Sequence, residues 1–162
     1  MASGKAISDG KFKIVLLGDK DVGKTSILLR YVRDEFFERT SINPISDTTK
    51  NILINGRNIT LELWDTAGQE RFKSLETHYY RDADAAVLVY SVVDEESFSS
   101  LCDYWLKETL RYIPDGEMIP ILVVGNKSDL SGFEDEQVDI NTVKEYTQSC
   151  GLPLPLETSA KT

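Results

Sequence analysis

The chain has 162 residues, of which 41% are hydrophobic and 28% are charged, and its formal net charge is −9. This length and composition predict one soluble globular domain with a hydrophobic core. The acidic balance argues against a nucleic-acid-binding surface, which needs a basic patch, and no stretch reaches the roughly 18–20 apolar residues of a membrane span.

The first predicted strand, 12–17, runs into a phosphate-binding loop. The sequence Gly18–Thr25 fits the pattern G-x-x-x-x-G-K-[ST], and a helix predicted over 24–34 follows it. Gly18 and Gly23 allow the backbone to turn tightly and to approach phosphate groups closely. The amide groups at the start of the helix then point at the bound anion, which the helix dipole also favours.

The side chains of this loop suit a nucleotide that binds with Mg²⁺. Lys24 is placed to neutralise the β- and γ-phosphates, and the Thr25 hydroxyl can bind the metal ion. We therefore expect the loop to contact the nucleotide through Asp19, Lys20, Asp21, Val22, Gly23, Lys24, Thr25 and Ser26.

A hairpin and a polar turn come next in the chain. An Asn-Gly pair predicts a tight turn between strands 48–54 and 58–64. Asp65, directly after the second strand, can hold Mg²⁺ through a water molecule. The Gly68 amide can reach the γ-phosphate, where a side chain would block the approach. Gln69 can orient the attacking water, which makes it the predicted catalytic residue.

A loop with a short helix is expected over 66–80, followed by a strand over 85–91. We assign His78 to the surface of that loop rather than to a base or a metal ligand. The next helix carries apolar residues at helical spacing, which we assign to the hydrophobic core: Phe98, Leu101, Cys102, Trp105 and Leu110.

A base-recognition sequence, Asn126–Asp129, follows the apolar strand predicted over 119–125. The Asp129 carboxylate can accept hydrogen bonds from both N1–H and the N2 amino group of guanine. Adenine offers no such pair of donors, so this position discriminates between the two bases. The Lys127 stem can lie on the base, and the Asn126 amide can tie neighbouring loops together.

A helix near 141–149 and a strand near 154–158 complete the pattern. After that strand, the backbone amides of Ser159, Ala160 and Lys161 could donate to guanine O6. The alternation of strands and helices predicts an α/β fold, with a mostly parallel six-stranded sheet, one antiparallel edge strand and helices on both faces. Ligands of such sheets bind at the carboxyl ends of the strands, where all three motifs lie.

Together the motifs resemble the Ras superfamily of small GTPases, and four sequences resemble its Rab family: Trp64–Phe72, Tyr79–Arg81, Leu88–Tyr90 and Glu96–Phe98. The resemblance covers 11–162, after a lead-in over 1–10 that is expected to be flexible. It implies a P-loop G domain that binds GTP or GDP with Mg²⁺, stacks Phe36 on guanine, and hydrolyses GTP slowly as a switch in vesicle traffic. It also implies that an exchange factor, an activating protein and effectors bind near 36–49 and 66–80.

The chain departs from that family in three places. An ungapped count puts Asn43 where the family carries a threonine that reaches Mg²⁺ and the γ-phosphate, and either Ser41 or Thr40 could take that role instead. Lys20 and Asp21 stand where Rab proteins favour small residues in the phosphate-binding loop, and Asp47–Thr49 occupies the stretch where the Rab family carries a phenylalanine.

Two functions therefore remain open at this point. The intact magnesium and water-orienting positions favour a slow GTP hydrolase. Asn43, Lys20 and Asp21 favour a guanine-nucleotide-binding scaffold that hydrolyses GTP poorly. A third function, that of an ATP-dependent kinase, is disfavoured because the sequence Asn126–Asp129 is typical of guanine recognition.

The cysteines and the chain end bear on location. Cys102 and Cys150, expected to be free and at least half-buried, fit a reducing cytosol. The family's last helix and prenylated tail do not follow Thr162, so either the chain is a fragment of a longer one or the sheet face has another partner. We expect a cytoplasmic protein, bound to membranes only if a longer parent chain carries a lipidated tail.

Overall fold

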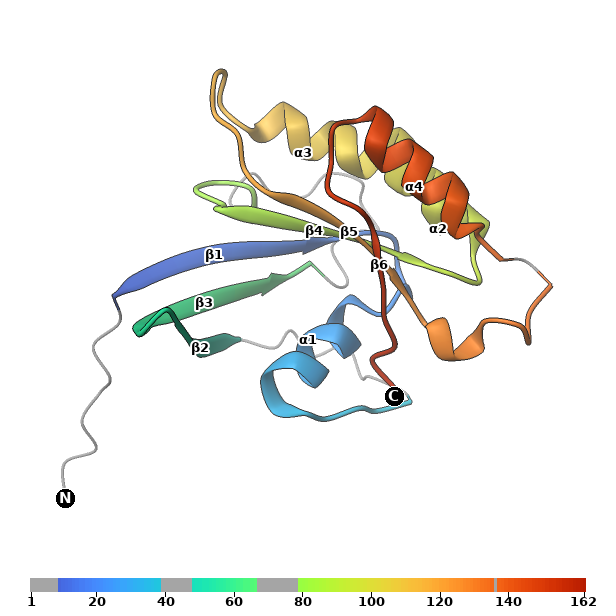
Figure 1. Ribbon diagram of the computed structural model, residues 1–162, viewed down its shortest axis with the longest axis horizontal. Coiled ribbons are helices and arrows are strands. Elements are labelled where there is room, and N and C mark those ends of the chain that lie inside the picture. The colour runs from blue at the N-terminus through green and yellow to red at the C-terminus, as the bar shows by residue number, and fades with distance from the viewer. Residues whose placement is uncertain (1–8, 39–47, 67–78, 136) are drawn as a thin grey trace.

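The computed structural model describes residues 9–38, 48–66, 79–135 and 137–162, and a twisted sheet forms its centre (Figure 1). The sheet has six strands in the order β2-β3-β1-β4-β5-β6. Neighbouring strands pair in parallel except β2 and β3, which pair antiparallel at one edge. The expected α/β sheet is therefore confirmed. The strands are β1 (Gly10–Leu17), β2 (Thr49–Ile54), β3 (Arg57–Asp65), β4 (Ala85–Ser91), β5 (Ile121–Asn126) and β6 (Leu156–Glu157).

Helices cover both faces of this sheet. Figure 1 shows α1 on one face and α2, α3 and α4 on the other. Two aspartates begin helices by capping free amide groups: Asp94 accepts from the Ser97 amide, and Asp139 accepts from the Asn141 amide. The helical segments are α1 (Lys24–Arg33), α2 (Glu95–Ser100), a π-helical turn (Leu101–Trp105), α3 (Leu106–Tyr112), a 3-10 turn (Ser128–Leu130) and α4 (Ile140–Ser149).

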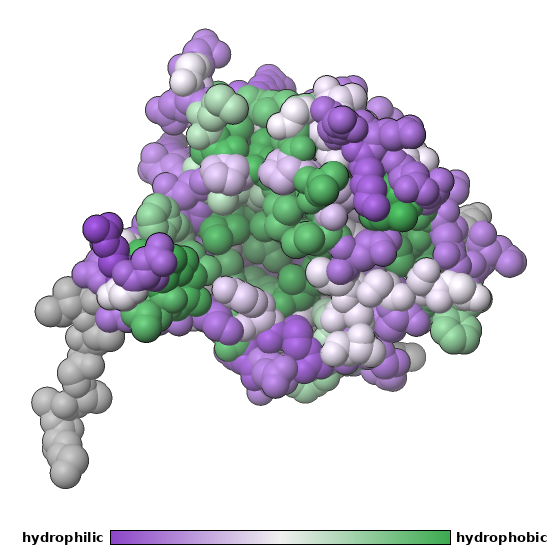
Figure 2. Space-filling model, viewed as in Figure 1, coloured by the Kyte–Doolittle hydropathy of each residue, from purple (hydrophilic) through white to green (hydrophobic). Residues whose placement is uncertain are grey.

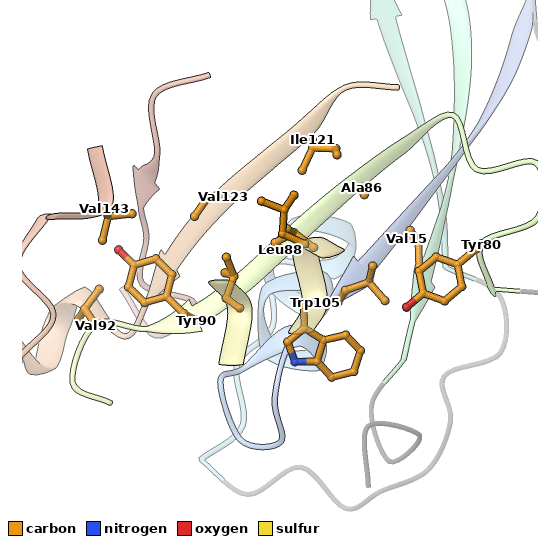
Figure 3. Packing of buried hydrophobic residues seen from close by; sticks show 13 residues of the cluster. Val15, Tyr80, Ala86, Leu88, Tyr90, Val92, Trp105, Ile121, Val123 and Val143 are labelled. Atoms are coloured by element: carbon orange, nitrogen blue, oxygen red, sulfur yellow. The ribbon is translucent and has the colours of Figure 1, made fainter. Parts of the chain in front are cut away.

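Alternating side chains of β1 divide the core into two parts. Val15 and Leu17 join the larger cluster, which packs under α2, α3 and α4 and is centred on β4 and β5 (Figure 3). Leu16 points to the opposite face and packs with Leu28 of α1 and Leu63 of β3. This division follows from the two-residue period of a strand that is covered on both faces.

The last predicted strand and one predicted core residue differ from the structure. The last strand contains only Leu156–Glu157, rather than 154–158. Pro153 and Pro155 lie before it, and proline has no amide hydrogen for a strand ladder. Leu110 was assigned to the core but is 53% exposed, because Thr109, four residues after buried Trp105, takes the buried position on the helix.

Smaller corrections concern exposed side chains. In α1, Tyr31 is 44% exposed, and Leu28 and Leu29 supply the buried face. Cys102 is half-buried as expected, whereas Cys150 is exposed because it follows the last residue of α4. Both cysteines are free, as predicted. A loop and a short helix were expected over 66–80. Residues 67–78 of this stretch, including His78, lie outside the described residues.

An apolar groove lies on the sheet face that α1 partly covers. Ile14 and Leu61 line it and also pack against the Leu16 and Leu28 cluster, which places the groove beside α1. Figure 2 shows apolar side chains reaching the surface over the sheet. The other apolar residues that line it are Phe12, Ile54, Ile59, Ala85 and Pro120. In the described part of the chain, no helix has the length and apolar character needed to span a membrane.

Candidate functional site

The phosphate-binding loop joins β1 to α1, and two glycines allow it to lie close to neighbouring strands. Gly18 has φ +149°, and a Cβ atom there would lie 2.2 Å from the Val89 carbonyl oxygen. Gly23 has φ +96°, and a Cβ atom there would lie 2.2 Å from Nδ2 of Asn126. Any larger residue would strain the backbone and push the loop away from β4 and β5.

Lys24 begins α1 and is buried inside the loop. Its side chain is 3% exposed, and Nζ donates to the carbonyl oxygens of Gly18 at 2.9 Å and Asp19 at 2.7 Å. The loop therefore wraps around the ammonium group. A cation held in this way, beside the backbone amides at the start of a helix, suits a bound phosphate group.

Thr25 and Asp65 come together from different elements. Thr25 lies in the first turn of α1, Asp65 ends β3, and the Thr25 hydroxyl donates to Oδ2 of Asp65 at 2.5 Å. Thr66 supports this arrangement, because its buried hydroxyl donates to the Leu16 carbonyl oxygen at 2.7 Å and ties the end of β3 to β1.

This oxygen pair fits Mg²⁺, which usually takes one or two protein oxygens and completes its shell with water and substrate phosphate. Among the described residues, no group of three or more His, Cys, Asp or Glu side chains could hold a metal ion.

Asn126 connects three loops. It ends β5 and is 2% exposed. Its Nδ2 donates to the Val22 carbonyl oxygen at 2.9 Å, which holds the phosphate-binding loop. Its Oδ1 accepts from the Ala160 amide at 3.3 Å and from the Thr158 hydroxyl at 3.4 Å, which holds the loop after β6. The tying role expected for this amide is therefore visible in its contacts.

The loop after β6 reaches back to Asp129 and to α1. The Ser159 hydroxyl donates to Oδ1 of Asp129 at 2.7 Å. Arg30 of α1 donates to the carbonyl oxygens of Ala160 at 2.8 Å and Lys161 at 3.1 Å. Arg30 thus holds the loop after β6 against α1. This role could not be predicted from the sequence, because no local sequence pattern links a helix residue to a loop 130 residues later.

One cleft of about 440 Å³ connects the phosphate-binding loop with Asn126–Asp129 and with the loop after β6. Most of the predicted nucleotide contacts from these three segments meet at this cleft, together with one aromatic side chain. Its lining includes Asp21, Gly23, Ser26, Phe36, Asn126, Lys127, Asp129, Ala160 and Lys161.

Other expected site residues lie elsewhere. Lys20 is exposed, with Nζ 3.8 Å from Oδ2 of Asp21, and it does not line the cleft. The Asp19 carboxylate accepts from the indole nitrogen of Trp105, which had been assigned to the core alone. Gly68 and Gln69 lie outside the described residues, as do the three switch candidates Thr40, Ser41 and Asn43.

Comparison with known proteins places this chain in a family. A family model described as the Ras family matches residues 13–162. The Ras-related protein RABD2a of Arabidopsis thaliana is 41% identical over 154 residues, which cover 94% of this chain and 73% of that protein. The chain carries a phosphate-binding loop, a Thr25–Asp65 pair and an Asn126–Asp129 loop, and it belongs to the Ras family of small GTPases and is similar to its Rab members.

Proposed function

We propose that this protein binds GTP and GDP with Mg²⁺ and acts as a molecular switch that hydrolyses GTP slowly. The observation that carries the proposal is the meeting of three segments, distant in sequence, around one cleft. The phosphate-binding loop also encloses the buried Lys24 ammonium group and leads to Thr25, whose hydroxyl meets the carboxylate that ends β3, while Asp129 offers a second carboxylate beside the loop after β6.

The phosphate end of the cleft is assigned to the loop around Lys24. The ammonium group and the amides at the start of α1 would contact the β- and γ-phosphates. Thr25 would bind Mg²⁺ directly and Asp65 would bind it through a water molecule. Bound Mg²⁺ would neutralise phosphate charge. On this assignment the 2.5 Å hydrogen bond between these two side chains gives way to shared binding of the ion.

The base end is assigned to Asp129 and the loop after β6. The Asp129 carboxylate would accept from N1–H and the N2 amino group of guanine, while the amides of Ser159, Ala160 and Lys161 would donate to O6. The Ser159 hydroxyl already holds one oxygen of Asp129, so the carboxylate is oriented before the base arrives. Phe36, which lines the same cleft, would stack on the ring.

The hydrolytic step is assigned from sequence position. Gln69 follows Asp65 by four positions and would orient the attacking water, while the Gly68 amide would contact the γ-phosphate. Intrinsic rates in this class are on the order of 10⁻⁴ s⁻¹, and an activating protein raises them by about 10⁵-fold. We expect this protein to be equally slow alone.

The cellular role is proposed from similarity. The Rab-like sequence supports a function in vesicle traffic, with an exchange factor, an activating protein and effectors bound near 36–49 and 66–80. On this proposal the protein works in the cytoplasm and would bind membranes only if a longer parent chain carries a lipidated tail. The proposed guanine-nucleotide-binding domain spans residues 11–162.

A scaffold that retains nucleotide but barely hydrolyses it is the second candidate. The observation that favours it is the exposed Lys20–Asp21 pair at the tip of the phosphate-binding loop. Two charged side chains there could hinder an activating protein or the water-orienting glutamine.

Measuring phosphate release and retained nucleotide on the same sample separates the two candidates. The purified protein is loaded with GTP and followed with and without Mg²⁺. The enzyme proposal predicts slow, Mg²⁺-dependent phosphate release that disappears in Gln69→Leu. Tight GTP retention with no release above that variant would favour the scaffold, and failure to retain guanine nucleotide would overturn both.

A further inference from the structure

A π-helical turn interrupts the helix between α2 and α3, at Leu101–Trp105. Such turns hold one extra residue per turn, are rare, and occur frequently at functional sites. Trp105 ends this turn and is 1% exposed. In Figure 3 its indole ring lies at the edge of the large core cluster, where the strands meet the loop that follows β1.

The indole of Trp105 contacts the phosphate-binding loop through a hydrogen bond. Its Nε1–H donates to Oδ1 of Asp19 at 2.8 Å, across 86 positions of sequence. Hydrogen bonds to a carboxylate are among the stronger ones in proteins, and this one is partly shielded from solvent. The rest of the ring packs in the core, with the Tyr104 ring 4.9 Å away in an edge-to-face arrangement.

Asp19 is therefore held at two points. Its side chain accepts from Trp105, and its backbone carbonyl oxygen accepts from Nζ of Lys24 at 2.7 Å. A shift of Asp19 would move one of the two carbonyl groups that orient the Lys24 ammonium group, the other being that of Gly18. The helix that carries Trp105 thus contacts the phosphate-binding loop through a residue next to its cation.

We propose that Trp105 is a positioning residue for nucleotide binding: through Asp19 it fixes the loop around Lys24 and slows the release of bound nucleotide. The inference rests on the proposed function only in using nucleotide release as its readout. It also gives the π-helical turn a role, because the turn sets the angle at which the indole meets Asp19.

A purely packing role for Trp105 makes a different prediction. Under that reading, the effects of Asp19→Ala and Trp105→Phe on nucleotide release would add, because the two side chains would act independently. Under our proposal, Asp19→Ala and Trp105→Phe break the same contact. Each would speed the release of a fluorescent GDP analogue by roughly five-fold or more. The double variant would release it no faster than the faster single variant.

Two further variants sharpen the test. Asp19→Asn keeps a neutral oxygen acceptor and is expected to release nucleotide at a rate between those of wild type and Asp19→Ala. Tyr146→Phe is the matched control. It removes a hydroxyl that donates to the Cys102 carbonyl oxygen at 3.3 Å, so it perturbs the same π-helical turn without touching the loop. Its release rate is expected to equal that of wild type.

A readout without nucleotide comes from the indole NMR signals of the two tryptophans. In Asp19→Ala the Trp105 indole proton should shift upfield as its hydrogen bond is lost, while the Trp64 signal stays in place. If wild type retains no GDP, the proposed function fails but this shift still tests the contact. If wild type retains GDP while Asp19→Ala releases it at the wild-type rate, or if the effects of Asp19→Ala and Trp105→Phe add, the inference is wrong. Should Trp105→Phe fail to fold, Asp19→Ala and Asp19→Asn still decide the matter.

Discussion

Asn126→Ala should destabilise the protein even when no nucleotide is bound. Two well-placed hydrogen bonds would be lost, from Nδ2 to the Val22 carbonyl oxygen at 2.9 Å and from the Ala160 amide to Oδ1 at 3.3 Å. The contact with the Thr158 hydroxyl at 3.4 Å is longer and contributes less. Because Asn126 is 2% exposed, water cannot easily replace the lost partners. Leaving a buried polar group unsatisfied costs about 1–3 kcal/mol, so the two together predict a loss of roughly 2–6 kcal/mol.

Urea unfolding of protein stripped of nucleotide measures this loss directly, since a bound ligand would add its own stabilisation. Asn51→Ala is the matched control, because Oδ1 of exposed Asn51 accepts a single hydrogen bond, from the Thr60 hydroxyl at 2.8 Å. A substitution at such a surface position is expected to cost about 0.5 kcal/mol or less. The reasoning would be refuted if Asn126→Ala cost no more than this control.

The remaining predictions concern the base, the phosphates, the switch and the thiols. Asp129→Asn should move the preference from guanine towards xanthine nucleotides, because an amide donor suits the C2 carbonyl of xanthine. Competition binding measures this preference, and an unchanged preference for guanine would show that the assignment is wrong. Lys24→Ala should weaken GDP binding ten-fold or more, since a charged hydrogen bond contributes ~1.5–3 kcal/mol, and an unchanged affinity in calorimetry would remove this loop from the site. GTP and GDP should bind wild type with similar affinity, and Asn43→Thr should sharpen the preference for GTP. Hydrogen exchange over residues 36–49, measured with each nucleotide, tests whether this segment responds differently to the two. Burial raises the pKa of the Cys102 thiol to about 11, so this thiol stays protonated at neutral pH. Alkylation of Cys102 should therefore become faster as the pH rises towards that value, and exposed Cys150 should be labelled first at pH 8.

The motifs of the candidate site could be predicted from the sequence because each is formed by residues that are close together in the chain. The phosphate-binding loop, the position of Asp65 at a strand end and the Asn126–Asp129 loop are short patterns whose geometry follows from neighbouring residues. The bounds of β4, 85–91, matched the structure because a buried central strand reads as an uninterrupted apolar run.

Features that depend on packing between distant elements were missed. Trp105 has the spacing of a core residue, and nothing near it in sequence signals that its indole nitrogen meets Asp19. Arg30 gives no local sign that it holds the carbonyl groups of Ala160 and Lys161. Each contact depends on the relative placement of a helix and a loop, which periodicity does not encode.

The central claim is that the cleft between the phosphate-binding loop and Asp129 selects guanine nucleotides. Titration calorimetry of nucleotide-free protein with GDP and with ADP, each with saturating Mg²⁺, tests this claim most directly. A site that hydrogen-bonds its ligand through buried polar groups can reject an analogue lacking the donors by about 10⁴-fold, so we predict tight binding of GDP and at least that preference over ADP. Equal affinity for the two nucleotides, or no binding of GDP, would contradict the account.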